Sequence, residues 1–116
     1  MDLENPDYWR GLINMSLSRF FILRTLHDAP AHGYVLLEKL TAFTHGCCTP
    51  AYGTIYPILK ALLEGEYAEV RETIADGRPR RVYALTPKGE SAYQVAVNTW
   101  KETLPYIERA LLEVSA

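Results

Sequence analysis

Hydrophobic residues recur at helical spacing in the first half of the chain. Residues 16–29, SLSRFFILRTLHDA, open with a serine that is able to cap a helix, carry four consecutive apolar residues at 20–23, and stop before Pro30. This run predicts a mostly buried helix. Residues 31–46 place Leu36, Leu37, Leu40 and Phe43 at helical spacing and end on Gly46, which predicts a second, amphipathic helix.

A third helix is predicted to start at Pro50, because Thr49 is a suitable N-cap and proline is well tolerated at the first helical position. At about 100° per residue, one stripe of this helix contains Ile55, Ile58, Leu59, Leu62 and Leu63. The opposite face contains Gly53, Pro57, Lys60 and Glu64, with Thr54 and Tyr56 on its flanks. The apolar stripe is expected to face a core, which leaves a nearly flat outward face.

The second half of the chain predicts two strands and a long helix. Residues 66–74 and 80–86 are short β-branched and aromatic runs, joined by ADGRPR with its Asp-Gly hairpin signal. A helical pattern then begins after Thr86, with an interruption expected at Pro105.

This order of elements predicts a mainly α fold with a small antiparallel β-hairpin. It is the order of a winged helix-turn-helix, in which the third helix enters the DNA major groove and the hairpin reaches the adjoining backbone. We expect an N-terminal extension at 1–15, a winged-helix DNA-binding domain at 16–86 and a C-terminal dimerisation helix at 87–116. The alternative is a three-helix core with a hairpin, in which Tyr52 and Tyr56 only pack.

Composition fits a single domain, while the charge argues mildly against nucleic acid. The chain has 116 residues, of which 48% are hydrophobic, and a formal net charge of −2 at pH 7. Basic residues nevertheless crowd into one stretch that contains Arg71, Arg78, Arg80, Arg81 and Lys88. A protein-interaction winged helix is the main alternative function, and this arginine set favours phosphate binding over it.

No feature of the sequence predicts an enzyme, a cofactor or a secreted protein. The histidines have no nucleophile or carboxylate at a recognisable spacing, and no glycine-rich phosphate loop is present. An acidic N-terminus and the lack of a long apolar run favour a cytoplasmic location without membrane contact. The adjacent Cys47 and Cys48 exclude a disulfide framework; they are turn residues or, with His45, a thiol- or metal-responsive site.

Three motifs resemble the PadR family of bacterial transcriptional regulators: HGY at 32–34, YGTIYPILKALLEGEY at 52–67 and GRPRRVYALTPKGE at 77–90. The resemblance implies a dimeric repressor that binds an inverted-repeat DNA operator and is released by a small molecule or another signal. It covers residues 16–116 and matches the compact subgroup with one long C-terminal helix. The implied DNA-binding positions are Tyr34, Thr49, Tyr52, Thr54, Tyr56 and Lys60, with Arg78, Arg80 and Arg81 on the wing.

The last helix carries an apolar seam of the kind that pairs helices. Its members recur at alternating steps of four and three residues and are Tyr93, Val97, Trp100, Leu104, Ile107, Leu111 and Val114. The seam predicts a homodimer, or else it covers the chain's own first helix. The resemblance further implies that aromatic effectors bind between the last helices of the dimer, near Trp100, Tyr93 and Val97; the alternative is that Trp100 fills an interface core.

Overall fold

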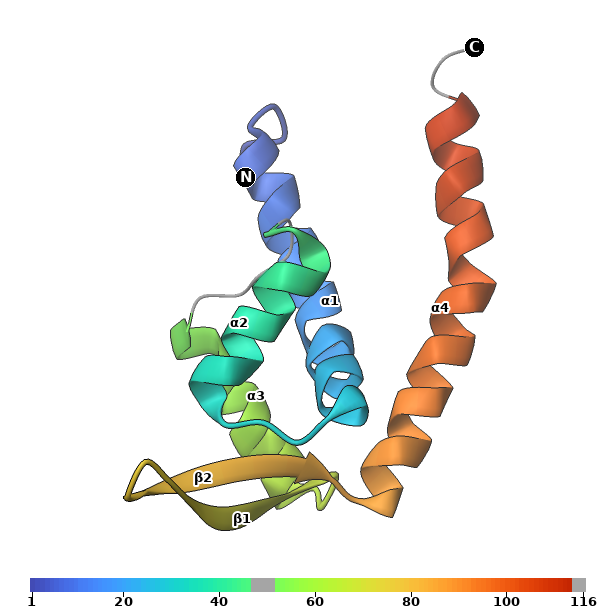
Figure 1. Ribbon diagram of the computed structural model, residues 1–116. Helices are drawn as coiled ribbons and strands as arrows, with labels where there is room; N and C mark the ends of the chain where they lie inside the picture. Colours follow the sequence, from blue (N-terminus) through green and yellow to red (C-terminus); the bar gives the residue numbers. More distant parts are fainter. Residues whose placement is uncertain (47–51, 114–116) are drawn as a thin grey trace.

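The computed structural model describes residues 1–46 and 52–113, and these form helices and one hairpin (Figure 1). The elements in chain order are α1 (Pro6–Asp28), α2 (Gly33–Thr44), α3 (Tyr52–Glu64), β1 (Ala68–Ala75), β2 (Arg78–Leu85) and α4 (Pro87–Glu113). The order agrees with the predicted winged helix followed by a long C-terminal helix. None of the described helices combines the length and the apolar character that a membrane crossing needs.

Helix α1 begins ten residues earlier than the predicted start at Ser16. The side chain of Asn5 accepts a hydrogen bond from the backbone N–H of Asp7 at 2.9 Å, and Pro6 occupies the first helical turn. The true cap is therefore Asn5. Ser16, the predicted cap, lies inside the helix, where its hydroxyl donates to the carbonyl of Ile13 at 3.0 Å.

The core is formed by one apolar stripe from each of the first three helices. Its fully buried members are Ile22, Leu36, Leu40, Ile55 and Leu59. Tyr83 of β2 joins this cluster, and its backbone N–H and C=O exchange hydrogen bonds with Ala31 at 2.9 and 3.0 Å. The hairpin is thereby attached to the connection between α1 and α2.

The hairpin is longer, and its turn shorter, than the sequence predicts. The strands pair antiparallel from Ala68 opposite Leu85 to Ala75 opposite Arg78. Only Asp76 and Gly77 form the turn, and both have positive φ (54° and 73°), as a two-residue type I′ turn requires. The predicted ADGRPR loop was wrong because its last three residues, 78–80, belong to β2.

Helix α4 continues through Pro105 to Glu113, so the interruption expected there does not occur. Its start is as predicted: the Thr86 hydroxyl accepts from the N–H of Gly89 at 3.1 Å. The same hydroxyl donates to the carbonyl of Glu66 at 2.7 Å, and the Thr86 N–H donates to the carbonyl of Tyr67 at 3.1 Å. The start of α4 is therefore bonded directly to the turn between α3 and β1.

Lys88 and Gly89 add further contacts between the start of α4 and the turn that follows α3, here called the Thr86 junction. The Lys88 ammonium donates to the carbonyl of Gly65 at 2.8 Å and lies 4.4 Å from the centre of the Tyr67 ring. A Cβ on Gly89 would lie 2.0 Å from the carbonyl oxygen of Tyr67. Only a residue without a side chain allows the two segments to approach this closely.

The Gly89→Ala variant is expected to lose about 3 kcal/mol of unfolding free energy, the upper end of the usual cost of overpacking. Urea unfolding followed by circular dichroism measures this. Gly11→Ala is the matched control, because nothing lies within 4 Å of a Cβ at that helical position. It should raise stability by about 0.5–1 kcal/mol. Equal stability of Gly89→Ala and the wild type would contradict the close approach.

Candidate nucleic-acid interface

The outward face of α3 is the exposed surface that the periodicity predicts. Ile55, Ile58 and Leu59 are buried in the core. The exposed residues of the helix include Gly53, Thr54, Tyr56, Pro57, Lys60 and Glu64. A Cβ at Gly53 would have no atom within 4 Å, so this face is open and low at its start. Such a surface allows a flat partner to approach the helix backbone closely.

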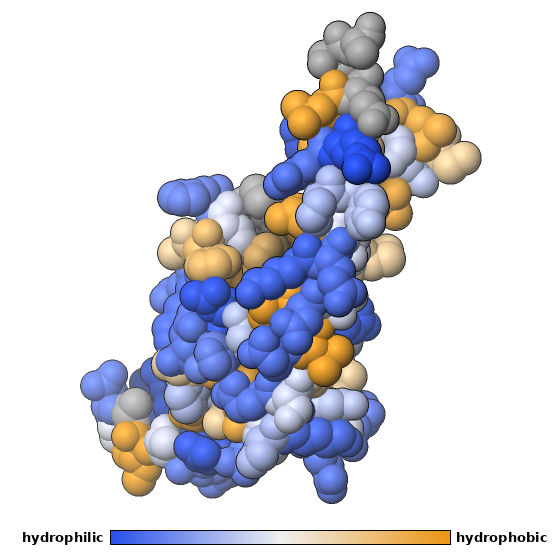
Figure 2. Space-filling model, turned by 90° about the vertical axis from the view of Figure 1, so that its right-hand side faces the viewer, coloured by the Kyte–Doolittle hydropathy of each residue, from blue (hydrophilic) through white to orange (hydrophobic). Residues whose placement is uncertain are grey.

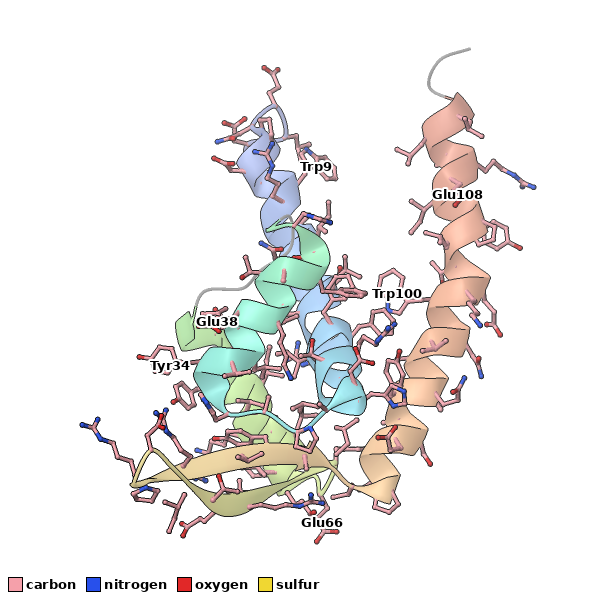
Figure 3. The ribbon with its side chains drawn as sticks, viewed as in Figure 1. Trp9, Tyr34, Glu38, Glu66, Trp100 and Glu108 are labelled. Atoms are coloured by element: carbon pink, nitrogen blue, oxygen red, sulfur yellow. The ribbon has the colours of Figure 1, made fainter. Side chains whose placement is uncertain are left out.

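Tyr34 and Lys60 are both predicted to bind DNA, but they have different surroundings. Tyr34 lies near the start of α2, and its side chain points away from the helical core (Figure 3). Lys60 approaches Glu64 at 4.0 Å, one turn further on, in an exposed pair. Pairs of this kind contribute little and exchange readily with other anions. Thr49, Cys47, Cys48 and the side chain of Tyr52 lie outside the described residues.

The hairpin supplies three arginines that have no carboxylate partner within the described parts of the chain. Arg78 and Arg81 are exposed and Arg80 is half-buried. Arg71, by contrast, is held by Glu69 at 2.8 Å. On the distal hairpin these three arginines stand against two carboxylates, Glu72 and Asp76, so the excess of positive charge is small.

A hollow of about 510 Å³ lies where the outer side of α3 meets β2. It is lined by Tyr56, Pro57, Lys60, Leu63, Arg81 and Tyr83. The guanidinium of Arg81 lies 5.9 Å from the centre of the Tyr83 ring, which places its charge at the edge of the hollow. One cation from the helix and one from the strand thus border the same space, an arrangement suited to an anion such as a phosphate.

A second hollow, of about 400 Å³, lies between α1 and α4. Its lining residues are Leu17, Phe20, Phe21 and Arg24 from α1, with Tyr93, Val97, Trp100, Lys101 and Leu104 from α4. Trp100 points from α4 toward α1 (Figure 3), and its ring centre lies 6.1 Å from that of Phe20. The structure therefore brings together the three residues predicted for effector binding.

The α1 side of this hollow is absent from the predicted site. Phe20 stacks on Tyr93 with ring centres 6.0 Å apart, and Arg24 lies 5.2 Å from the centre of the Phe43 ring. Both side-chain oxygens of Asp28 accept from Arg24 at 3.1 Å, and this hydrogen bonding raises the pKa of the guanidinium. The two consecutive phenylalanines at 20–21 were the sequence feature that could have indicated this side of the hollow. They were interpreted only as part of a buried helix.

The described residues contain no cluster of three histidine, cysteine or acidic side chains that is able to hold a metal ion. His45 is instead the left-handed cap residue that ends α2, with φ of 52°.

The sequence pattern of the "Transcriptional regulator PadR-like family" matches residues 22–95, from the last two turns of α1 to the first turns of α4. The chain belongs to this family. The PadR-like match covers the end of α1, all of α2, α3 and the hairpin, and the junction with α4. Members of the family are DNA-binding transcriptional regulators, in line with the predicted function and not with an enzyme.

Individual proteins show the same relationship. This PadR-like chain is 36% identical over 74 residues to the transcriptional regulator Rv3488 of Mycobacterium tuberculosis, covering 64% of this chain and 66% of that protein. It is 37% identical over 71 residues to the transcriptional regulator YqjI of Escherichia coli, covering 61% of this chain and 33% of the relative. The match thus spans two thirds or less of each of these relatives.

Solved structures share the fold. A PadR-like transcriptional regulator from Bacillus cereus superposes with a TM-score of 0.74 at 23% identity, covering 84% of this chain and 93% of that one. A PadR family regulator from Eggerthella lenta superposes with a TM-score of 0.75 at 19% identity, covering 95% and 97%. The fold of the Eggerthella lenta protein therefore matches this chain over almost its whole length.

Proposed function

We propose that this PadR-like protein is a dimeric repressor that binds an inverted-repeat operator and releases it when a small aromatic molecule binds. The observation that carries the DNA-binding part is the hollow in which Lys60 of α3 and Arg81 of β2 meet beside the exposed face of α3. With α3 in a major groove, a phosphate of the adjoining strand fits between these two cations.

The other residues of the proposed interface form two groups: those on α3 suit contacts with bases, and those on the hairpin suit contacts with phosphates. Gly53 and Thr54 lie at the start of α3, where a low surface and a hydroxyl suit contacts with base edges. The Tyr56 hydroxyl suits a phosphate or a base. Arg78, Arg80 and Arg81 project from the hairpin and contact the backbone, which positions the protein without reading sequence. Sequence preference therefore depends on α3, and affinity depends more on the hairpin.

Arg78→Ala and Arg80→Ala should each lower the slope of log affinity against log salt by about 1 for every phosphate that the variant no longer neutralises. They should weaken binding to all sequences alike, whereas Thr54→Ala should change which sequences are preferred. A gel shift with a random duplex across a salt series measures the slopes. Selection of bound sequences from a random library measures the preference.

Arg71→Ala is the control for these wing variants, because Arg71 is already paired with Glu69 and should not alter the slope. Wing variants with unchanged salt dependence would show that the hairpin does not touch DNA. A wild-type protein that binds no duplex at any salt concentration would favour the protein-interaction module.

Dimer formation is supported by apolar residues that the chain itself leaves uncovered. Helices α1 and α4 pack together near the base of α4 and diverge toward the N-terminus of α1 and the end of α4 (Figure 1). The exposed residues on the divergent parts include Trp9, Leu12 and Ile13 on α1, and Leu104, Ile107 and Leu111 on α4. Within the described part of the predicted seam, Tyr93, Val97 and Trp100 face the chain's own first helix and Leu104 borders the hollow beside it. Val114 lies outside the described residues.

The face of α4 that turns away from α1 has a different character. Figure 2 shows a mainly hydrophilic band along the outer side of α4, with hydrophobic residues at its edges and toward its end. A second copy that pairs through the divergent ends would bury the apolar residues and leave this band in water. Two such α3 helices would then reach half-sites about one helical turn apart.

We expect the wild type to sediment as a dimer at micromolar concentration. The double variant Leu104→Glu with Ile107→Glu should sediment as a monomer, because four carboxylates would have to be buried in each dimer. Asn98→Glu adds a charge to the opposite side of α4 and should leave the dimer intact. A wild-type protein that sediments as a monomer at this concentration would contradict the assembly.

Effector binding is supported by the hollow between α1 and α4. Aromatic rings of Phe20, Tyr93 and Trp100 border it, and a planar aromatic molecule would stack among them. A ligand there changes the packing of α4 on α1. Because the start of α4 is bonded to the turn that follows α3, such a change also moves the two α3 helices of the dimer relative to each other.

Titration with planar aromatic compounds, phenolic acids included, should quench tryptophan fluorescence and release the operator. The chain has two tryptophans, so single variants separate their signals. Trp9→Phe should keep both effects. Trp100→Phe should lose the quenching and require more ligand for release. If quenching and release persist unchanged in Trp100→Phe, the effector does not bind beside Trp100.

A further inference from the structure

A third hollow, of about 360 Å³, lies between α1 and the start of α3. Its lining includes Met15, Ser18 and Arg19 of α1 and Gly53, Thr54 and Pro57 of α3. Pro57 also lines the hollow that contains Lys60 and Arg81. The two hollows therefore share one ridge, which is the exposed face of α3.

Helical geometry places these two hollows on opposite flanks of α3. At about 100° per residue, Gly53 and Pro57 lie near the middle of the exposed face, with Thr54 toward one flank and Tyr56 toward the other. Thr54 lines the hollow beside α1, whereas Tyr56 lines the hollow beside β2. The exposed face of α3 is thus bordered by α1 on one flank and by the hairpin on the other.

Arg19 alone carries a charge among the described residues that line the hollow beside α1. Its side chain is exposed, and no carboxylate within residues 1–46 and 52–113 forms an ion pair with it. Arg10 and Arg24, on the same helix, are by contrast each held by an aspartate at 3.1 Å. The guanidinium of Arg19 is therefore available to an anion that lies along this flank of α3.

The dimensions of the DNA major groove bring both flanks of α3 to a phosphate. An α-helix with its side chains is about 10–12 Å across, and the groove is about 12 Å wide. A helix that fills the groove lies between the two sugar-phosphate backbones, so each flank faces a different strand. With Lys60 and Arg81 at the strand on the hairpin side, Arg19 faces the strand on the α1 side.

We propose that Arg19 binds a phosphate of the strand opposite to the one bound by Lys60 and Arg81, so that α3 is held from both rims of the major groove. This inference rests on the proposed DNA binding and gives α1 a direct part in it. A phosphate contact carries no sequence information but fixes position. Its effect is to set how closely Gly53 and Thr54, which line the same hollow, approach the base edges.

Uncharged phosphates locate the contact on the DNA. The duplex is one that the full-length wild-type chain selects from a random library, and each phosphate of a half-site is replaced in turn by a methylphosphonate. The wild type should lose affinity about tenfold at positions on both rims, because each such replacement removes a charge-assisted hydrogen bond. Arg19→Gln should no longer respond on one strand but should keep its response on the other. Lys60→Gln should show the reverse pattern, which identifies the hairpin-side strand.

Salt dependence tests the charge of Arg19 itself. Arg19→Gln should weaken binding about tenfold per half-site and lower the slope of log affinity against log salt by about 1 for each phosphate lost. Arg19→Lys keeps the charge and should keep the wild-type slope. Arg10→Gln is the matched control, since it makes the same change on the same helix at a residue already paired with Asp7. It should bind like the wild type.

Two results would overturn the contact while leaving DNA binding in place. In one, Arg19→Gln responds like the wild type to every methylphosphonate. In the other, the wild type responds only on the hairpin-side strand, and this second result decides the matter even where sedimentation or thermal unfolding shows that Arg19→Gln does not assemble or fold. A wild-type chain that binds no duplex contradicts the proposed function as a whole.

Discussion

Tyr83 joins the hairpin to the helices in two ways at once. Its side chain is buried in the cluster formed by α1, α2 and α3, and its backbone exchanges two hydrogen bonds with Ala31. Because a buried aromatic side chain and a paired backbone both resist displacement, the hairpin has one position relative to α3. The hollow between Lys60 and Arg81 exists only because that position is held. The geometry of the side proposed to face DNA thus depends on one residue of β2.

A second joint, centred on Thr86, holds α4 in the same manner. One hydroxyl both caps α4 and bonds the turn that ends α3, while Gly89 allows the two backbones to touch. The first turns of α4 are additionally held against α1, where His27 lies 2.6 Å from Glu90 and stacks on Tyr93. The helix that carries the apolar seam and the helix proposed to face DNA are therefore connected through a few hydrogen bonds.

Local signals in the sequence were enough for most of the fold. The stripe of Ile55, Ile58 and Leu59 predicted the outward face of α3, and Thr86 with Pro87 predicted the start of α4, because each signal involves neighbours in sequence. The start of α1 was missed because its first half buries few residues within the chain, so apolar periodicity there is weak. Pro105 was expected to break α4, but it lies on a fully exposed part of the helix, where the carbonyl that loses its N–H partner is open to solvent and the lost hydrogen bond costs less.

The site was harder to predict than the fold. Arg78 and Arg80 were recognised from their crowding, and both strands were predicted, but residues 78–80 at the start of β2 were assigned to the connecting loop. The hollow between α1 and α4 pairs Phe20 with Trp100, which are far apart in sequence, and no local pattern encodes such a contact. The candidate DNA-binding residues were predicted mainly through their resemblance to a family, since exposed polar side chains carry no periodic signal of their own.

Helix α4 has 27 residues, which at 1.5 Å per residue makes it about 40 Å long, yet only its first half is held by the rest of the chain. The distal half of α4 is therefore attached to the rest of the chain only through the first half of the same helix and the Thr86 junction. Substitutions in this distal half leave the contacts of α3 and the hairpin unchanged. If α3 and the hairpin bind DNA as proposed, the end of α4 is free to change in evolution while the DNA-binding surface stays the same.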